Sequence, residues 1–198
     1  MLVAVAVSLG LMSIPSSIVG QQPAPAFNTS GELVRPPDYR AWVFLTSGLG
    51  MTYGPAQPAA GRPPLFDNVF VTREAYTTFM QSGRWPDKTM FILEGRRAET
   101  NVSINNGGHT QGEIAFLEAA VKDTERFKNT GGWGYFSFDS QNGLKASAAP
   151  LPSTARCYSC HSENTAVDNT FVQFYPELMA VAKAKGTVKP TYDPAKKP

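Results

Sequence analysis

The residues with the clearest chemistry form a Cys-Tyr-Ser-Cys-His pentapeptide at positions 157–161, which holds both cysteines and one of the two histidines of this 198-residue chain. On a helical turn Cys157 and Cys160 lie on the same side, so each thiol can form a thioether with one vinyl group of a haem. His161 follows directly and would coordinate the iron as proximal ligand. The pattern predicts one covalent haem c, held by Cys157, Cys160 and His161.

A Cys-x-x-Cys pair has two other interpretations. A thioredoxin-like redox disulfide is expected near a βαβ pattern, which the sequence does not show. A structural zinc site needs four Cys or His ligands, and His109 is the only other histidine. The histidine directly after the second cysteine favours haem attachment over both.

Composition limits the fold and the partners. The length suits one domain with its own core. The net charge of +2 is mild and the basic residues do not cluster with aromatic ones, so we expect no nucleic-acid partner. Aromatic residues make up 11% of the chain, and its 17 Gly and 16 Pro predict many turns. This balance favours many short strands over long helices.

The amino-terminal segment resembles an export signal. Residues 2–14 are apolar except for two serines and are too short to span a bilayer. Cleavage after Gly20 or Ala26 would leave no stable membrane span, although no Lys or Arg precedes the apolar run, so an uncleaved anchor is the alternative. We therefore expect a signal peptide or anchor at 1–26 and a periplasmic or secreted protein, which agrees with the attachment of c-type haem outside the bacterial cytoplasmic membrane.

The rest of the chain divides into three parts. The polar, Pro-rich residues 27–37 are expected to form a linker, residues 38–186 the haem domain, and the Lys-rich residues 187–198 a disordered tail. Aromatic and β-branched runs predict strands. These lie at 41–45, 68–71, 89–93 and 133–138.

Three helices are also expected. The first starts with Thr72 as N-cap and ends before Gly83. The second is the turn around the pentapeptide at 155–162, and the third begins with Pro176 in its first turn. Residues 113–122 fit a helix or a strand, and the flanking glycines and the need for sheet partners favour a strand.

One carboxylate has an unusual place in this pattern. On an extended backbone Glu94 shares a face with Met90 and Ile92. A carboxylate on an apolar face needs a partner, and burial tends to raise its pKa. Glu94 is therefore the candidate distal acid or base of the haem site.

Beyond the pentapeptide, the sequence resembles the cytochrome P-460 family, which includes hydroxylamine-oxidising cytochromes and the nitric-oxide-binding β-type cytochromes c′. The matching segments are Tyr-Arg-Ala-Trp-Val-Phe at 39–44, Gly-Arg-Trp-Pro-Asp at 83–87, Gly-Gly-Trp at 131–133 and Ala-Val-Asp-Asn-Thr-Phe-Val-Gln-Phe-Tyr-Pro at 166–176. The resemblance implies an α+β, mainly β fold with an antiparallel sheet and a few helices, a haem near the carboxyl terminus and often a homodimer. It also implies that His161 is the only protein ligand to iron, which leaves the distal side open.

The resemblance also implies a test of the enzymatic branch, in which a lysine is covalently joined to the haem. That lysine belongs on the strand after residues 83–87, but residues 89–94 contain none, and Lys88 precedes the strand in a turn. This difference favours the nitric-oxide-binding branch. A second axial ligand would have to be His109, Met51 or Met90, which we interpret as a turn residue and two core residues.

Three functions remain open at this point. The chain is a haem protein that binds nitric oxide, an oxidase of hydroxylamine or a related amine with Glu94 in the distal pocket, or a six-coordinate electron carrier. A redox partner is also expected, and the sequence does not identify it.

Overall fold

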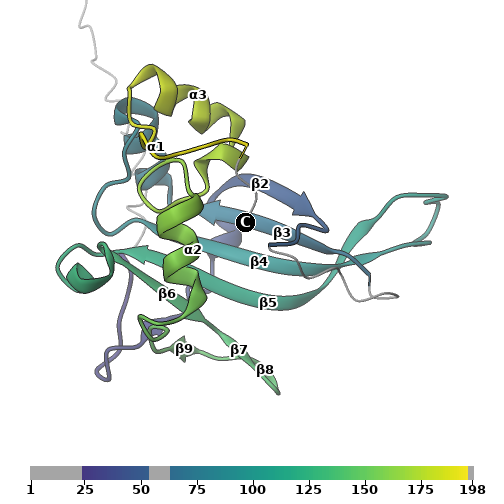
Figure 1. The fold of residues 1–198 in the computed structure, drawn as a ribbon. Helices are drawn as coiled ribbons and strands as arrows, with labels where there is room; N and C mark the ends of the chain where they lie inside the picture. The colour runs from purple at the N-terminus through teal and green to yellow at the C-terminus, as the bar shows by residue number, and fades with distance from the viewer. Residues whose placement is uncertain (1–23, 54–62, 196–198) are drawn as a thin grey trace, which may run out of the picture.

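The computed structural model describes residues 24–53 and 63–195. Within them, five strands form one antiparallel sheet in the order β2-β3-β4-β5-β6, and three α-helices accompany it (Figure 1). The strands are β2 (Val43–Leu49), β3 (Leu65–Val71), β4 (Met90–Glu99), β5 (Thr110–Lys122) and β6 (Trp133–Ser137). The helices are α1 (Arg73–Ser82), α2 (Arg156–Asn164) and α3 (Pro176–Ala184). The predicted fold, α+β and mainly β with an antiparallel sheet, is confirmed.

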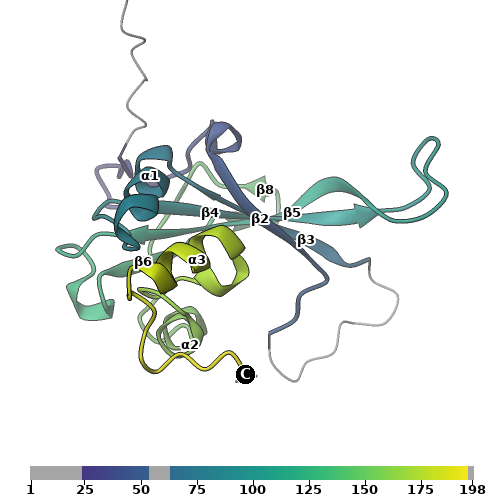
Figure 2. The same ribbon diagram turned by 90° about the horizontal axis from the view of Figure 1, so that it is seen from above.

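Each face of the sheet carries its own hydrophobic cluster, because side chains alternate along a strand. On β4, Met90 and Ile92 belong to one cluster, whereas Phe91 belongs to the other. The second cluster also contains residues of α1 and α3 and contacts Cys157 and Tyr158 of α2. All three helices therefore cover this face, and Figures 1 and 2 show α2 and α3 on the same side of the sheet.

The opposite face is covered by the amino-terminal part of the described chain. Leu33 is fully buried in the first cluster, and β1 (Leu33–Val34) pairs with β9 (Ser147–Ala148). The expectation of a linker at 27–37 is therefore wrong for this stretch. Phe27 also packs against the first cluster. The partners of Phe27 and Leu33 lie more than 100 residues later in the chain, so the local sequence does not reveal this packing.

Short 3-10 turns and a small ladder complete the connections. They are η1 (Tyr39–Ala41), η2 (Lys128–Thr130), η3 (Val172–Phe174), β7 (Asp139–Ser140) and β8 (Gly143–Leu144). The first predicted strand starts at Val43 instead of residue 41, because Trp42 donates its N–H to the Tyr39 carbonyl and closes η1.

The predicted helix and strand types hold along the rest of the chain. Thr72 precedes α1 and Gly83 ends it with a φ of +70°, a left-handed conformation that suits glycine. Residues 110–122 are a strand, as the flanking glycines indicated. The long hairpin of β4 and β5 projects from the body of the molecule (Figure 1), and His109 lies exposed next to its turn.

The carboxyl-terminal residues 187–195 are in contact with the domain, contrary to the expected disordered tail. Val188 and Tyr192 pack against the second cluster. Lys189 donates from Nζ to the Ser162 carbonyl at 3.0 Å, near the end of α2, where a cation complements the helix dipole. Residues 1–23 of the expected signal lie outside the described part, and no helix inside it is both long and apolar enough to cross a membrane.

Candidate functional site

Helix α2 presents the pentapeptide as the sequence predicts. It runs from Arg156 to Asn164, so Cys157, Cys160 and His161 fall within one and a half turns. Both cysteines are free thiols and partly buried. Burial raises the pKa of the Cys157 thiol, which keeps it protonated at neutral pH.

The imidazole of His161 is held in one orientation. Its Nδ1 lies 2.8 Å from the Asn169 carbonyl oxygen, which can only accept, so Nδ1 carries the proton and Nε2 is left as the free lone pair. The ring packs against Tyr135 and Phe171, with centroid distances of 4.5 and 4.7 Å. Burial lowers the pKa of His161, so the ring is neutral at pH 7 and ready to bind a metal.

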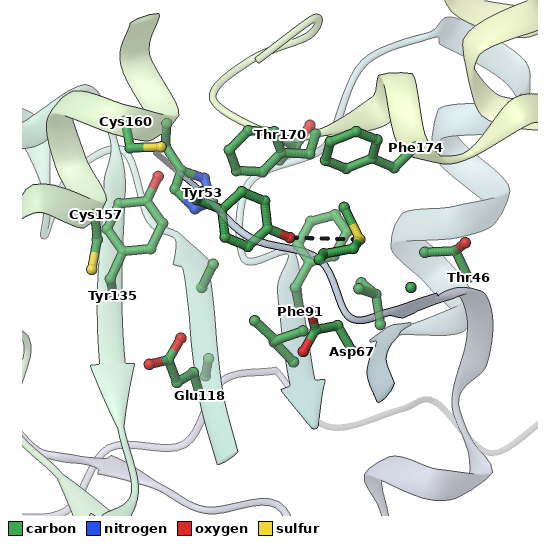
Figure 3. A pocket seen from close by; sticks show the side chains of 18 of the residues that line it. Thr46, Tyr53, Asp67, Phe91, Glu118, Tyr135, Cys157, Cys160, Thr170 and Phe174 are labelled. Atoms are coloured by element: carbon green, nitrogen blue, oxygen red, sulfur yellow. Dashed lines mark hydrogen bonds between the residues drawn. The ribbon is translucent and has the colours of Figure 1, made fainter. Parts of the chain in front are cut away.

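A cavity of about 540 Å³ lies between α2 and the sheet. Figure 3 shows the cysteines at one side of it and the carboxylates of Asp67 and Glu118 on the strands. Its walls combine strand residues with residues of the loops and η3. They are Thr46, Gly48, Met51, Tyr53, Val69, Phe91, Leu93, Ala119, Ala120, Tyr135, Phe136, Leu151, Arg156, Thr170, Phe171, Phe174 and Tyr175, in addition to Asp67, Glu118, Cys157, Cys160 and His161. Most of these side chains are apolar or aromatic.

The carboxylates of the cavity are residues that the sequence did not single out. Burial raises the pKa of Asp67 to about 6. Burial, with the negative charges of Asp139 and Asp67 nearby, also raises the pKa of Glu118. Alternation along β3 places Asp67 on the face of Val69, and alternation along β5 places Glu118 on the face of Ala120. Only the sheet order shows that both of these faces are turned toward α2.

The structure corrects the assignment of Glu94 as distal acid or base. Glu94 lies on the opposite face, is fully buried and does not line the cavity. Its carboxylate accepts hydrogen bonds from Arg40 at 2.7 Å and from Arg96 at 2.7 Å, and also from the Tyr39 hydroxyl. Burial alone would raise the pKa, but these donors together lower it to about 2. Glu94 is therefore a paired structural charge.

The candidate second axial ligands and the candidate cross-linking lysine lie in different parts of the structure. Met51 lines the cavity, whereas Met90 is buried in the cluster on the far face and His109 is exposed near the tip of the hairpin. Lys88 lies in the turn before β4 and pairs with Asp123 at 2.6 Å. Among the described residues, the cavity wall contains no lysine.

The residues around the cavity fit a covalently bound haem. Two thiols and a neutral imidazole with a free Nε2 face it from one helix. The volume lies in the range of cofactor pockets. The Tyr135 hydroxyl is buried in the wall and has no hydrogen-bond partner within residues 24–53 and 63–195, a cost that a polar group of a bound cofactor would remove. Cys157, Cys160 and His161 would hold the haem.

Comparison with known proteins agrees with this geometry. A family model described as Cytochrome P460 matches residues 36–172, which include all five strands of the sheet, the whole pentapeptide and most of the residues that line the cavity. No curated protein matches the sequence. The chain therefore belongs to the cytochrome P-460 family and is a haem-binding cytochrome.

Proposed function

We propose that the protein is an exported cytochrome with a single haem c, attached through Cys157 and Cys160 and ligated by His161, whose open distal side binds small nitrogen species. The observation that carries this proposal is the cavity between α2 and the sheet, which has the pentapeptide on one side and apolar strand residues on the other. When bound, the haem supplies an open coordination position and a one-electron redox couple.

The cavity wall determines which ligands fit. Val69, Phe91 and Leu93 form an apolar surface that favours a small neutral molecule, such as nitric oxide or unprotonated hydroxylamine, over a charged one. Oxidation of hydroxylamine also releases protons. Burial raises the pKa of Asp67 to about 6 and also raises that of Glu118, so both carboxylates are suited to accept these protons as general bases.

A six-coordinate electron carrier is the second candidate, and Met51 is the observation that favours it. Among the described residues that line the cavity, it is the one thioether. Its sulfur accepts a hydrogen bond from the Tyr53 hydroxyl at 3.7 Å and lies over Gly48, where an added Cβ would be 2.1 Å away. Because the sulfur is engaged by these neighbours, we propose the open site over the carrier.

Export remains part of the proposal, and one contact bears on the cleavage site. The Ala26 carbonyl accepts the N–H of Val34 at 2.8 Å, next to the bridge between Phe27 and Leu33. Cleavage after Gly20 keeps this contact, whereas cleavage after Ala26 removes it. We therefore propose cleavage after Gly20 and a periplasmic or secreted mature protein.

The test is a set of visible spectra of protein made in a host that attaches c-type haem. We expect a high-spin ferrous haem whose spectrum changes on addition of nitric oxide, and we expect His161→Ala to keep the haem while changing its spin state. Met51→Leu should leave the spin state unchanged, with Met90→Leu as the matched control on the far face. A low-spin ferrous haem that becomes high-spin only in Met51→Leu would show the carrier instead. A strongly red-shifted Soret band would show a lysine cross-link.

A further inference from the structure

The carbonyl that orients His161 belongs to a tight two-residue turn. Val167 and Thr170 form an antiparallel bridge, and the two residues between them, Asp168 and Asn169, have φ values of +44° and +57°. Two consecutive left-handed residues are the pattern of a type I′ hairpin turn, which Asp and Asn tolerate better than most residues. The Asn169 carbonyl points back to His161 Nδ1.

The Asp168 side chain anchors this turn to the sheet. The Asp168 carboxylate accepts a hydrogen bond from Lys122 Nζ at 2.5 Å and one from Trp133 Nε1 at 3.4 Å. Lys122 and Trp133 are paired across β5 and β6. Lys122 Nζ also donates to the Trp85 carbonyl at 2.8 Å, and Trp85 Nε1 donates to Thr170 Oγ1 at 2.8 Å.

The ion pair of Lys122 and Asp168 can hold the turn in place more firmly than an exposed ion pair could. The Lys122 side chain is 16% exposed, so its pair with Asp168 is less screened by water than an exposed pair would be. The pair joins Lys122, the last residue of β5, to Asp168 of the turn. The next residue, Asn169, carries the carbonyl that orients His161. A hydrogen bond from the non-coordinating nitrogen of a metal-bound histidine fixes the ring and raises its basicity.

We propose that Lys122 and Asp168 are positioning residues for His161: their ion pair holds the 168–169 turn so that the Asn169 carbonyl accepts the hydrogen bond from Nδ1–H and thereby tunes the haem iron. The inference rests on the proposed ligation of haem by His161. Strong donation by the ring stabilises the ferric state, so loosening the turn should raise the midpoint potential of the haem.

A purely electrostatic effect of the two charges makes a different prediction. Removing the Lys122 cation alone would stabilise ferric iron and lower the potential, whereas removing the Asp168 anion would raise it. Positioning instead predicts a rise in both variants. The sign of the shift in the lysine variant therefore separates the two explanations.

The experiment compares Lys122→Met and Asp168→Gly in the haem-loaded protein by potentiometric titration and by resonance Raman spectra of the iron–histidine vibration. We expect a positive shift of the midpoint potential and a lower iron–histidine frequency in both. Lys122→Arg should restore the wild-type values because it keeps a cationic donor to Asp168. Lys88→Met is the matched control, since it breaks the 2.6 Å pair with Asp123, which does not touch the turn.

Other results would overturn the inference. Opposite shifts for Lys122→Met and Asp168→Gly, with an unchanged iron–histidine frequency, would show a charge effect only, and unchanged values in both would remove any role. If Lys122→Met does not fold, Asp168→Gly still decides through the frequency, because its left-handed backbone suits glycine. Wild-type protein that carries no covalent haem would instead refute the proposed function.

Discussion

The two faces of the sheet hold buried carboxylates in opposite electrostatic settings. On β3, the neighbours Asp67 and Asn68 point to opposite sides, Asp67 into the cavity and Asn68 toward Glu94, to which it donates a hydrogen bond at 3.1 Å. The pKa of Glu94 is lowered to about 2 by its donors, whereas burial raises that of Asp67 to about 6.

The difference separates structural from functional burial of charge. Glu94 has two arginines, a tyrosine and an asparagine as donors, so its charge is fully compensated and stabilises the fold. In the cavity, Asp67 and Glu118 are shifted chiefly by burial, which disfavours their charged form. Buried carboxylates whose pKa is raised in this way are typical of functional sites.

The largest expected effect comes from removing the Glu94 carboxylate from its donors. Glu94→Gln leaves Arg40 and Arg96 without their carboxylate and should reduce the free energy of unfolding by about 3–5 kcal/mol at pH 7, as measured by urea denaturation. Because the folded pKa is lowered from 4.5, the pairing stabilises the protein above that pH and is lost as pH falls toward 2. The difference in free energy of unfolding between the variant and the wild type should therefore be smaller at pH 3 than at pH 7.

A matched control lies on the same strand. Glu99→Gln changes an exposed carboxylate and should alter stability by less than about 0.5 kcal/mol. Equal losses in both variants would contradict a special role for the Glu94 pairing.

Removing a carboxylate from the cavity should raise the free energy of unfolding, which is the opposite of the effect expected for Glu94→Gln. Asp67→Asn removes a carboxylate whose folded pKa is raised from 3.8 to about 6, so its penalty is absent below pH 4 and develops as pH rises through 6. The variant should be more stable than wild type at pH 8 by at most about 3 kcal/mol. Thermal unfolding across pH measures this, and a destabilised variant at pH 8 would refute the unpaired character of Asp67.

Glu118→Gln should act in the same direction but less, because Glu118 is only partly buried. In haem-loaded protein we expect it to leave nitric oxide binding intact and to slow the consumption of hydroxylamine. Stopped-flow spectra with each ligand check this, and equal rates with hydroxylamine would remove Glu118 from proton transfer.

The smallest effect is expected outside both faces. His109→Ala alters an exposed residue near the tip of the hairpin and should change neither the haem spectrum nor the stability by more than about 0.5 kcal/mol. A change in spin state would mean that His109 reaches the iron.

Local pattern predicted much of this molecule, and long-range pairing accounts for what it missed. The pentapeptide, its helix and the face of Glu94 follow from spacing along a few residues. The partners of Glu94 do not, because Arg40 is 54 residues away in sequence. Likewise, Asp67 and Glu118 meet at one cavity only through the sheet order, and Leu33 is buried only because it pairs with Ala148.

The central claim is that α2 holds a haem through its two thiols, and the most direct test is the denatured intact mass of protein made in a host that attaches c-type haem. The wild-type mass should exceed that of the mature polypeptide by one haem, whereas the Cys157→Ser, Cys160→Ser double variant should show the polypeptide alone. A wild-type mass without haem, from cells that load a control cytochrome, would contradict the account.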